Sequence, residues 1–119
     1  MSQQNEFGKK GEQLAVDYLI NKGYTILKRN FRFDKAEVDI ISQKDDILVI
    51  VEVKARSTSE FGDPQKFVKA KQINNLIKAV DNYVVENDLD IDIRFDIIAI
   101  VKDGANFTIE HLENAFYHF

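Results

Sequence analysis

The sequence predicts one α/β domain with the element order α-β-β-β-α-β-β. Two segments carry apolar residues at helical spacing, and five shorter segments alternate or run apolar between turn residues. The chain has 119 residues, 45% of them hydrophobic and 11% aromatic, which is enough for one core. Residues 1–119 are therefore expected to form a single domain.

The first helix is expected over residues 6–22 and the first strand over residues 24–29. An amphipathic stripe and a glycine C-cap, Gly23, predict the helix, and the stripe consists of Gly11, Leu14, Ala15, Tyr18 and Leu19. Glu12 borders this stripe and can point along the edge of the core toward the sheet. The same pattern also allows Glu12 to be a capping or solvent-facing residue of the first helical turns.

Residues 37–41 and 47–54 are expected to form a hairpin. The polar stretch between them reads as a turn, and a loop centred on Asp45-Asp46 places Asp39 directly across from Glu52. A symmetric four-residue loop keeps this pairing, whereas a three-residue loop shifts it by one residue. The relation between the two acids thus depends on the turn.

The second half of the chain predicts a helix and another hairpin. Asp63-Pro64 is a helix start that follows a loop at residues 57–62, and the apolar stripe of that helix is Phe67, Ile73, Leu76, Ile77, Val80, Tyr83 and Val84. A strand is expected over residues 91–101. A turn at Asp103-Gly104 would then pair Ile100 with Phe107 and Ile98 with Ile109.

Two charges end the apolar run Ile47–Val51. Glu52 and Lys54 share one face of the strand because side chains alternate every two residues. Asp39 opposite Glu52 would repel it unless a hard divalent cation lay between the carboxylates, and Mg²⁺ typically takes one or two carboxylates plus water and phosphate oxygens. From spacing alone, a surface ion pair at a strand end explains these charges equally well.

Asp39 followed by Glu52-Val53-Lys54 resembles the PD-(D/E)xK nuclease signature. Over residues 7–101 the chain further resembles the YraN family, on the segments Gly8-Lys9-Lys10-Gly11-Glu12, Tyr18-Leu19, Gly23-Tyr24, Arg29-Asn30-Phe31-Arg32, Val51–Arg56, Phe61-Gly62, Lys71-Gln72 and Arg94-Phe95-Asp96. One departure is Ala36-Glu37, where that family usually has Gly-Glu. The family is similar in fold to archaeal Holliday junction resolvases. This implies a restriction-endonuclease-like three-layer α/β fold with a central mixed sheet flanked by helices.

The resemblance also implies roles for the site residues. Asp39 and Glu52, with the carbonyl of Val53 and the helix-borne Glu12, would hold Mg²⁺ or Mn²⁺. Lys54 would orient the attacking water or stabilise the developing charge. Gln72 stands where such nucleases often carry an auxiliary polar residue, or else on a solvated helix face. The best candidates for phosphate contacts are Arg29, Arg32, Arg56, Lys66 and Lys69.

Composition and charge distribution exclude some classes of function and favour others. The net charge is −4, yet basic residues gather in 28–35 and 54–78 and acids in 86–103, which suits a polyanion held on one face or plain solvated helices. There is no cysteine for thiolate or cysteine–zinc chemistry, and the longest apolar run is too short to span a membrane. His111 and His118 lie near the end of the chain and are expected to be incidental. We expect a cytoplasmic protein.

The sequence therefore predicts a magnesium-dependent endonuclease acting on DNA, with branched or junction DNA as the candidate substrate. No base-reading helix or finger occurs, so recognition by shape is expected. A junction substrate would favour a homodimer, because two strands must be cut. The alternative is a non-catalytic nucleic-acid-binding or scaffold module of DNA repair and recombination that keeps the same fold.

Overall fold

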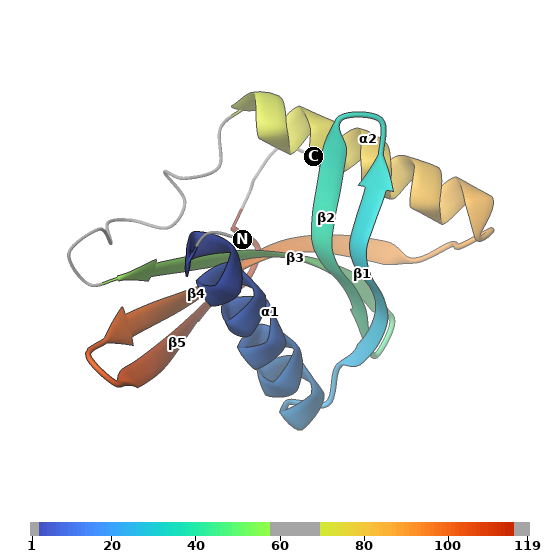
Figure 1. Cartoon of the computed structure of the whole chain (residues 1–119). Coiled ribbons are helices and arrows are strands. Elements are labelled where there is room, and N and C mark those ends of the chain that lie inside the picture. The colour runs from blue at the N-terminus through green and yellow to red at the C-terminus, as the bar shows by residue number, and fades with distance from the viewer. Residues whose placement is uncertain (1–2, 58–69, 116–119) are drawn as a thin grey trace.

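A computed structural model of the chain describes residues 3–57 and 70–115, with side chains from residue 7 onward. The elements are α1 (Gln3–Asn21), β1 (Thr25–Phe33), β2 (Ala36–Lys44), β3 (Ile47–Ser57), α2 (Ala70–Glu86), β4 (Asp92–Asp103) and β5 (Asn106–Leu112) (Figure 1). This order confirms the predicted α-β-β-β-α-β-β sequence. The predicted helix start at Asp63-Pro64, most of the loop at 57–62, and His118 lie outside the described residues.

The five strands form one mixed sheet in the order β1-β2-β3-β4-β5. Neighbouring strands are antiparallel except β3 and β4, which run parallel and are joined through α2. Figure 1 shows the β1–β2 hairpin rising steeply away from β3, so the sheet is strongly twisted. Parallel pairing brings the ends of β3 and β4 to the same edge of the sheet.

The two helices cover opposite faces of this sheet. Alternate residues of β3 enter separate cores: Leu48 and Ile50 pack in the cluster that contains α2, and Val49 and Val51 pack with α1. The period-2 alternation of a strand that is buried on both faces explains this division. The fold is thus three layers, helix on sheet on helix. Within the described residues, no helix is long and apolar enough to cross a membrane.

The first hairpin has the predicted register. Lys44 pairs with Ile47 and Ile40 with Val51 across the turn at Asp45-Asp46. The Gly23 C-cap is also confirmed: its φ is 93°, and the Tyr24 N–H donates to the Leu19 carbonyl at 2.9 Å. Strand β1 runs four residues beyond the predicted end at residue 29 because it follows β2 along the whole hairpin.

The predicted register of the second hairpin is wrong by two residues. Ile100 pairs with Ile109, and Asp103 pairs with Asn106, so the turn residues are Gly104-Ala105. Gly104 has a φ of 63°, and a glycine with positive φ suits the first central position of a tight hairpin turn. A shift of two residues keeps each side chain on its predicted face, so the core assignment is unaffected.

Candidate active site

Asp39 and Glu52 lie together where β2 separates from β3. The paired ladder between these strands ends at Ile40 and Val51, so Asp39 lies one residue beyond it. The Val53 N–H donates to Asp39 Oδ2 at 2.8 Å, and the Asp39 N–H faces Glu52 Oε1 at 3.5 Å. The structure therefore brings together the two acids that the hairpin register predicts to be opposite.

These two carboxylates are in an unfavourable electrostatic environment. Glu52 is 4% exposed, and burial followed by the neighbouring charge of Asp39 raises its pKa well above the ordinary value. Burial also raises the pKa of Asp39 to about 6, although the Val53 N–H opposes that rise. Among the described residues no ion pair reaches either carboxylate. A buried acid and a half-buried acid side by side, without a paired cation, favour either a shared proton or a bound metal.

Lys54 lies beside the acids, one alternate position beyond Glu52. Its charge lowers the pKa of both Asp39 and Glu52, and its side chain lines the same groove. A surface ion pair at a strand end does not describe this arrangement, because Glu52 is buried and makes no salt bridge to Lys54 in the described part of the chain. Lys54 is instead half-buried and lines the groove together with the two acids.

Helix α2 contributes Gln72. Its Nε2 lies 3.4 Å from Glu52 Oε2, so the amide is aimed at the carboxylate and is not on a solvated face. Asp39 holds one side of Glu52 and Gln72 the other. Gln72 therefore contacts the candidate site, as expected for an auxiliary polar residue.

Helix α1 brings Glu12 to the other side of the groove. Gly11 permits this approach, because a Cβ at that position would lie 3.0 Å from Ala55 Cβ of β3. Glu12 Oε1 accepts from Arg29 Nε at 3.2 Å and from Asn30 Nδ2 at 3.1 Å. The charge of Glu12 raises the pKa of Asp39, yet no three acidic or histidine side chains of the described residues gather at metal-binding spacing. Glu12 thus stands near the acid pair without joining it in one cluster.

The acids lie in an open groove of about 1600 Å³. Seven cations and four acids line it: Lys9, Arg32, Lys35, Lys54, Arg56, Lys71 and Lys102 against Glu12, Glu37, Asp39 and Glu52. Five of the seven cations come from the basic segments 28–35 and 54–78, although the chain as a whole is acidic. Such a groove provides a local positive potential for a polyanion.

The predicted phosphate contacts are distributed unevenly. Arg32 lines the groove and pairs with Glu37 at 3.2 Å, and Arg56 lines it while its Nη1 donates to the Ala55 carbonyl at 2.7 Å. Arg29 does not line the groove, since its guanidinium is bonded to Glu12 and Gln13. Lys66 and Lys69 lie outside the described residues.

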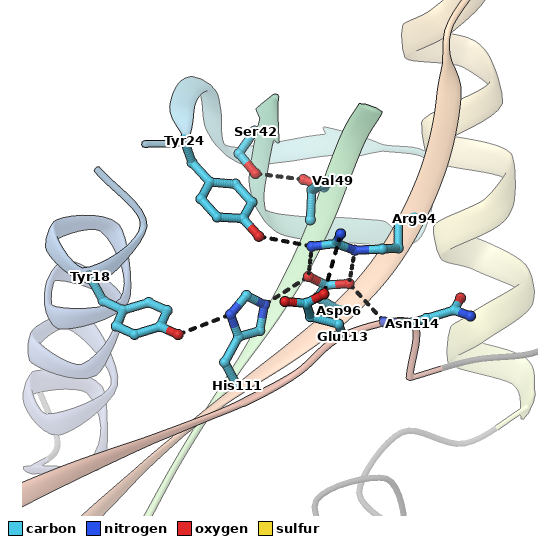
Figure 2. Close-up of polar contacts among 9 residues, drawn as sticks. All are labelled: Tyr18, Tyr24, Ser42, Val49, Arg94, Asp96, His111, Glu113 and Asn114. Carbon is cyan, nitrogen blue, oxygen red and sulfur yellow. Dashed lines mark hydrogen bonds and ion pairs between the residues drawn. The ribbon is translucent and has the colours of Figure 1, made fainter. Parts of the chain in front are cut away.

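Sequence reasoning missed a second buried polar cluster, on the α1 face of the sheet (Figure 2). Asp96 is fully buried and accepts from Arg94 Nε at 2.9 Å and Nη2 at 2.8 Å, while His111 Nε2 lies 2.7 Å from its Oδ2. The Asn114 N–H also donates to Asp96, and Arg94 Nη2 donates to the Tyr24 hydroxyl at 2.8 Å. His111, expected to be incidental, is instead part of this cluster and continues it to Tyr18. The alternation of Arg94 and Asp96 on one strand face was the available signal.

The Asp96 cluster is electrostatically balanced. Burial alone would raise the pKa of Asp96, but the hydrogen bonds from His111, Arg94 and Asn114 outweigh burial and hold that pKa below its ordinary value. In the described residues no buried side-chain polar atom lacks a hydrogen-bond partner. This cluster therefore has the character of a structural support, in contrast to the acid pair.

Fold and site together define an α/β protein whose central strand ends in paired acids and a lysine. The chain belongs to the uncharacterised protein family UPF0102, whose sequence profile matches residues 11–100. A UPF0102 protein of Flavobacterium psychrophilum is 59% identical over 119 residues, with all of both chains covered, and one of Christiangramia forsetii is 57% identical over the same span. One of Phocaeicola vulgatus is 44% identical over 98% of this chain and 97% of its own.

Proposed function

We propose that this protein is a metal-dependent endonuclease of the PD-(D/E)xK superfamily that hydrolyses phosphodiester bonds in DNA. The observation that carries the proposal is the pair of facing acids, Asp39 and Glu52, with no cation paired to either in the described residues. Lys54 beside them and the cation-lined groove above them supply the other parts that such a reaction needs.

The donor set fits Mg²⁺ or Mn²⁺. Two carboxylates and the Val53 carbonyl provide hard oxygen ligands, and burial raises the pKa of both acids, an effect that a bound cation would oppose. Asp39, Glu52 and Val53 would hold the ion, and Glu12 would complete the surroundings from the α1 side. When bound, such an ion polarises a phosphate and lowers the pKa of its water.

The chain's own residues then divide the remaining work. The Val53 N–H fixes the Asp39 carboxylate, and Gln72 faces Glu52 from α2, so both acids are held before any ligand arrives. Lys54 orients the attacking water or stabilises charge that develops on the phosphate. Arg32, Arg56 and the other groove cations hold flanking phosphates without reading the base sequence.

The proposed substrate class is DNA recognised by its shape, including branched or junction DNA. An open groove lined by cationic side chains suits contacts to backbone phosphates, whose path follows the shape of the DNA. A four-way junction has two strands to cut, so this substrate would require two copies of the chain acting together.

The decisive experiment is cleavage of a labelled panel of single-stranded, duplex, flap and four-way-junction DNA, plus RNA, with Mg²⁺, Mn²⁺ or EDTA. We expect metal-dependent cutting that falls by about 100-fold or more in Lys54→Ala, because a preorganised charge at the reacting phosphate is lost. The matched control is Lys78→Ala, which removes an exposed lysine of α2 outside the groove and should cut normally.

The outcomes separate the candidate functions. Cleavage that persists unchanged in purified Lys54→Ala would assign the activity to a contaminant or another site. Binding of DNA without cutting under every condition would favour the non-catalytic nucleic-acid-binding module instead.

A further inference from the structure

The conformation of Asn30 is unusual for a residue within a strand. Its φ is 53°, in the left-handed region that side chains rarely adopt, and asparagine tolerates this region better than most residues do. Asn30 lies within β1, between Arg29, which pairs with Ile40, and Phe31, which pairs with Val38. Only Asn30 and Asp39 are missing from this part of the ladder, so the irregularity in β1 stands opposite the acid of the site.

The side chain of Asn30 crosses to helix α1. Its Nδ2 donates to Glu12 Oε1 at 3.1 Å, and Arg29 Nη2 lies 3.2 Å from the same oxygen. Arg29 is itself held by Gln13, whose Oε1 accepts from Nη1 at 2.9 Å. The contacts of Asn30 and Arg29 with Glu12 all end on its Oε1. The second carboxylate oxygen, Oε2, takes no part in them.

We propose that Asn30 is a positioning residue that holds the Glu12 carboxylate in the groove beside Asp39. The left-handed backbone releases Asp39 from the β1–β2 ladder, and the amide side chain fixes Glu12 with one oxygen left for the metal or its water. Arg29 supports the same carboxylate and is not a phosphate contact. This inference rests on the endonuclease function proposed above.

The two parts of this role can be separated by substitution. Asn30→Gly keeps a residue that adopts positive φ freely but removes the amide. Asn30→Asp keeps the side-chain shape but replaces the donor with a second carboxylate against Glu12. Asp34→Gly is the matched control, since Asp34 has a φ of 55° in the turn of the same hairpin and does not line the groove.

The experiment measures Mn²⁺ binding by titration calorimetry together with kcat and KM on the best DNA substrate. We expect Asn30→Gly to fold normally and to lose about ten-fold in Mn²⁺ affinity and in kcat, with little change in KM, because residues behind metal ligands typically contribute 10–100-fold. Asn30→Asp should lose more, and Asp34→Gly should match the wild type.

A double-mutant cycle tests whether Asn30 acts through Glu12. In a Glu12→Ala background, Asn30→Gly should cause no further loss of Mn²⁺ affinity or kcat. Equal losses in both backgrounds, or a wild-type Mn²⁺ affinity and kcat in Asn30→Gly, would overturn the inference and leave the endonuclease proposal standing. A wild-type protein that neither binds Mn²⁺ nor cuts DNA would overturn both.

Discussion

Two buried carboxylates on adjacent strands, Glu52 and Asp96, have opposite environments. They are the most buried charged side chains among the described residues, and Asp96 pairs in register with Val51, next to Glu52. Asp96 receives an arginine, a histidine and a backbone N–H, whereas Glu52 faces another acid. Burial of an acid therefore does not identify a functional site in this protein. The absence of charge compensation is what distinguishes the site that we propose at Glu52 from the Asp96 cluster.

The two clusters also lie on opposite faces of the sheet. Asp96 points to the α1 face, where its partners His111 and Arg94 contact Tyr18 and Tyr24 (Figure 2). Glu52 points to the α2 face and lines the groove. The enclosed cluster is complete without any ligand. The open one exposes its unbalanced charge to the groove, which is the expected arrangement when stability is given up for function.

The largest effect on stability is expected at the balanced cluster. Asp96→Ala leaves Arg94 and His111 without their common acceptor, and breaking a buried charged network by removing one partner typically costs about 3 kcal/mol or more. Urea unfolding should show this loss in the free energy of unfolding. Asp92→Ala removes an exposed acid of the same strand and should change little. A loss below about 1 kcal/mol at Asp96 would remove the contrast between the clusters.

Substitution of Glu52 is expected to change the free energy of unfolding in the opposite direction. Glu52→Gln removes a buried charge that faces Asp39, and it should raise the free energy of unfolding at pH 8 by about 1 kcal/mol. The folded-state pKa of Glu52 is raised, so wild-type stability is greatest below the unfolded pKa and falls as pH rises toward the folded value. The advantage of Glu52→Gln should therefore vanish near pH 4.

Thermal unfolding from pH 4 to pH 8 measures this difference, with Glu110→Gln, an exposed acid of β5, as the control. Mn²⁺ should enlarge the difference between the two proteins. It should stabilise the wild type increasingly as pH rises through about 6, because the pKa of Asp39 is about 6 and metal binds the deprotonated acid. It should stabilise Glu52→Gln less. A destabilised Glu52→Gln at pH 8 would mean that the acid pair is structural.

The smallest effect on stability is expected at the rim of the groove. Arg32 and Glu37 pair with side chains that are 78% and 41% exposed, so Arg32→Ala should change the free energy of unfolding by less than about 0.5 kcal/mol. DNA binding measured over a range of salt concentrations should nevertheless weaken, with the salt slope reduced by about one. Lys28→Ala, an exposed cation that does not line the groove, should leave the slope unchanged.

Local pattern was sufficient for most of the fold. Turn residues Asp45-Asp46 set the β2–β3 register, and Gly23 ended α1, because both signals act over four or five residues. The β4–β5 register was missed by two residues because Asp-Gly can begin a turn or occupy its centre. In this hairpin, glycine takes the first central position.

The candidate site was predictable only in part. Strand alternation and hairpin register brought Asp39, Glu52 and Lys54 together from sequence alone. Asn30 and the His111–Asp96 contact were not accessible in this way, because each joins residues from separate elements through side-chain geometry. Arg29 is a further example. Its positive charge predicted a phosphate contact, whereas in the folded protein it pairs with Glu12.

The sequence by itself determined the order of elements, the two-sided burial of β3 and the acid pair at its end, since these follow from periodicities of two and 3.6 residues and from short turns. Tertiary structure alone decided which charges are compensated. Whether a buried acid meets a cation or another acid depends on which side chains the twist of the sheet and the packing of α1 and α2 bring within hydrogen-bond distance. Gln72 and His111, for example, lie 20 and 15 residues from the acids that they contact.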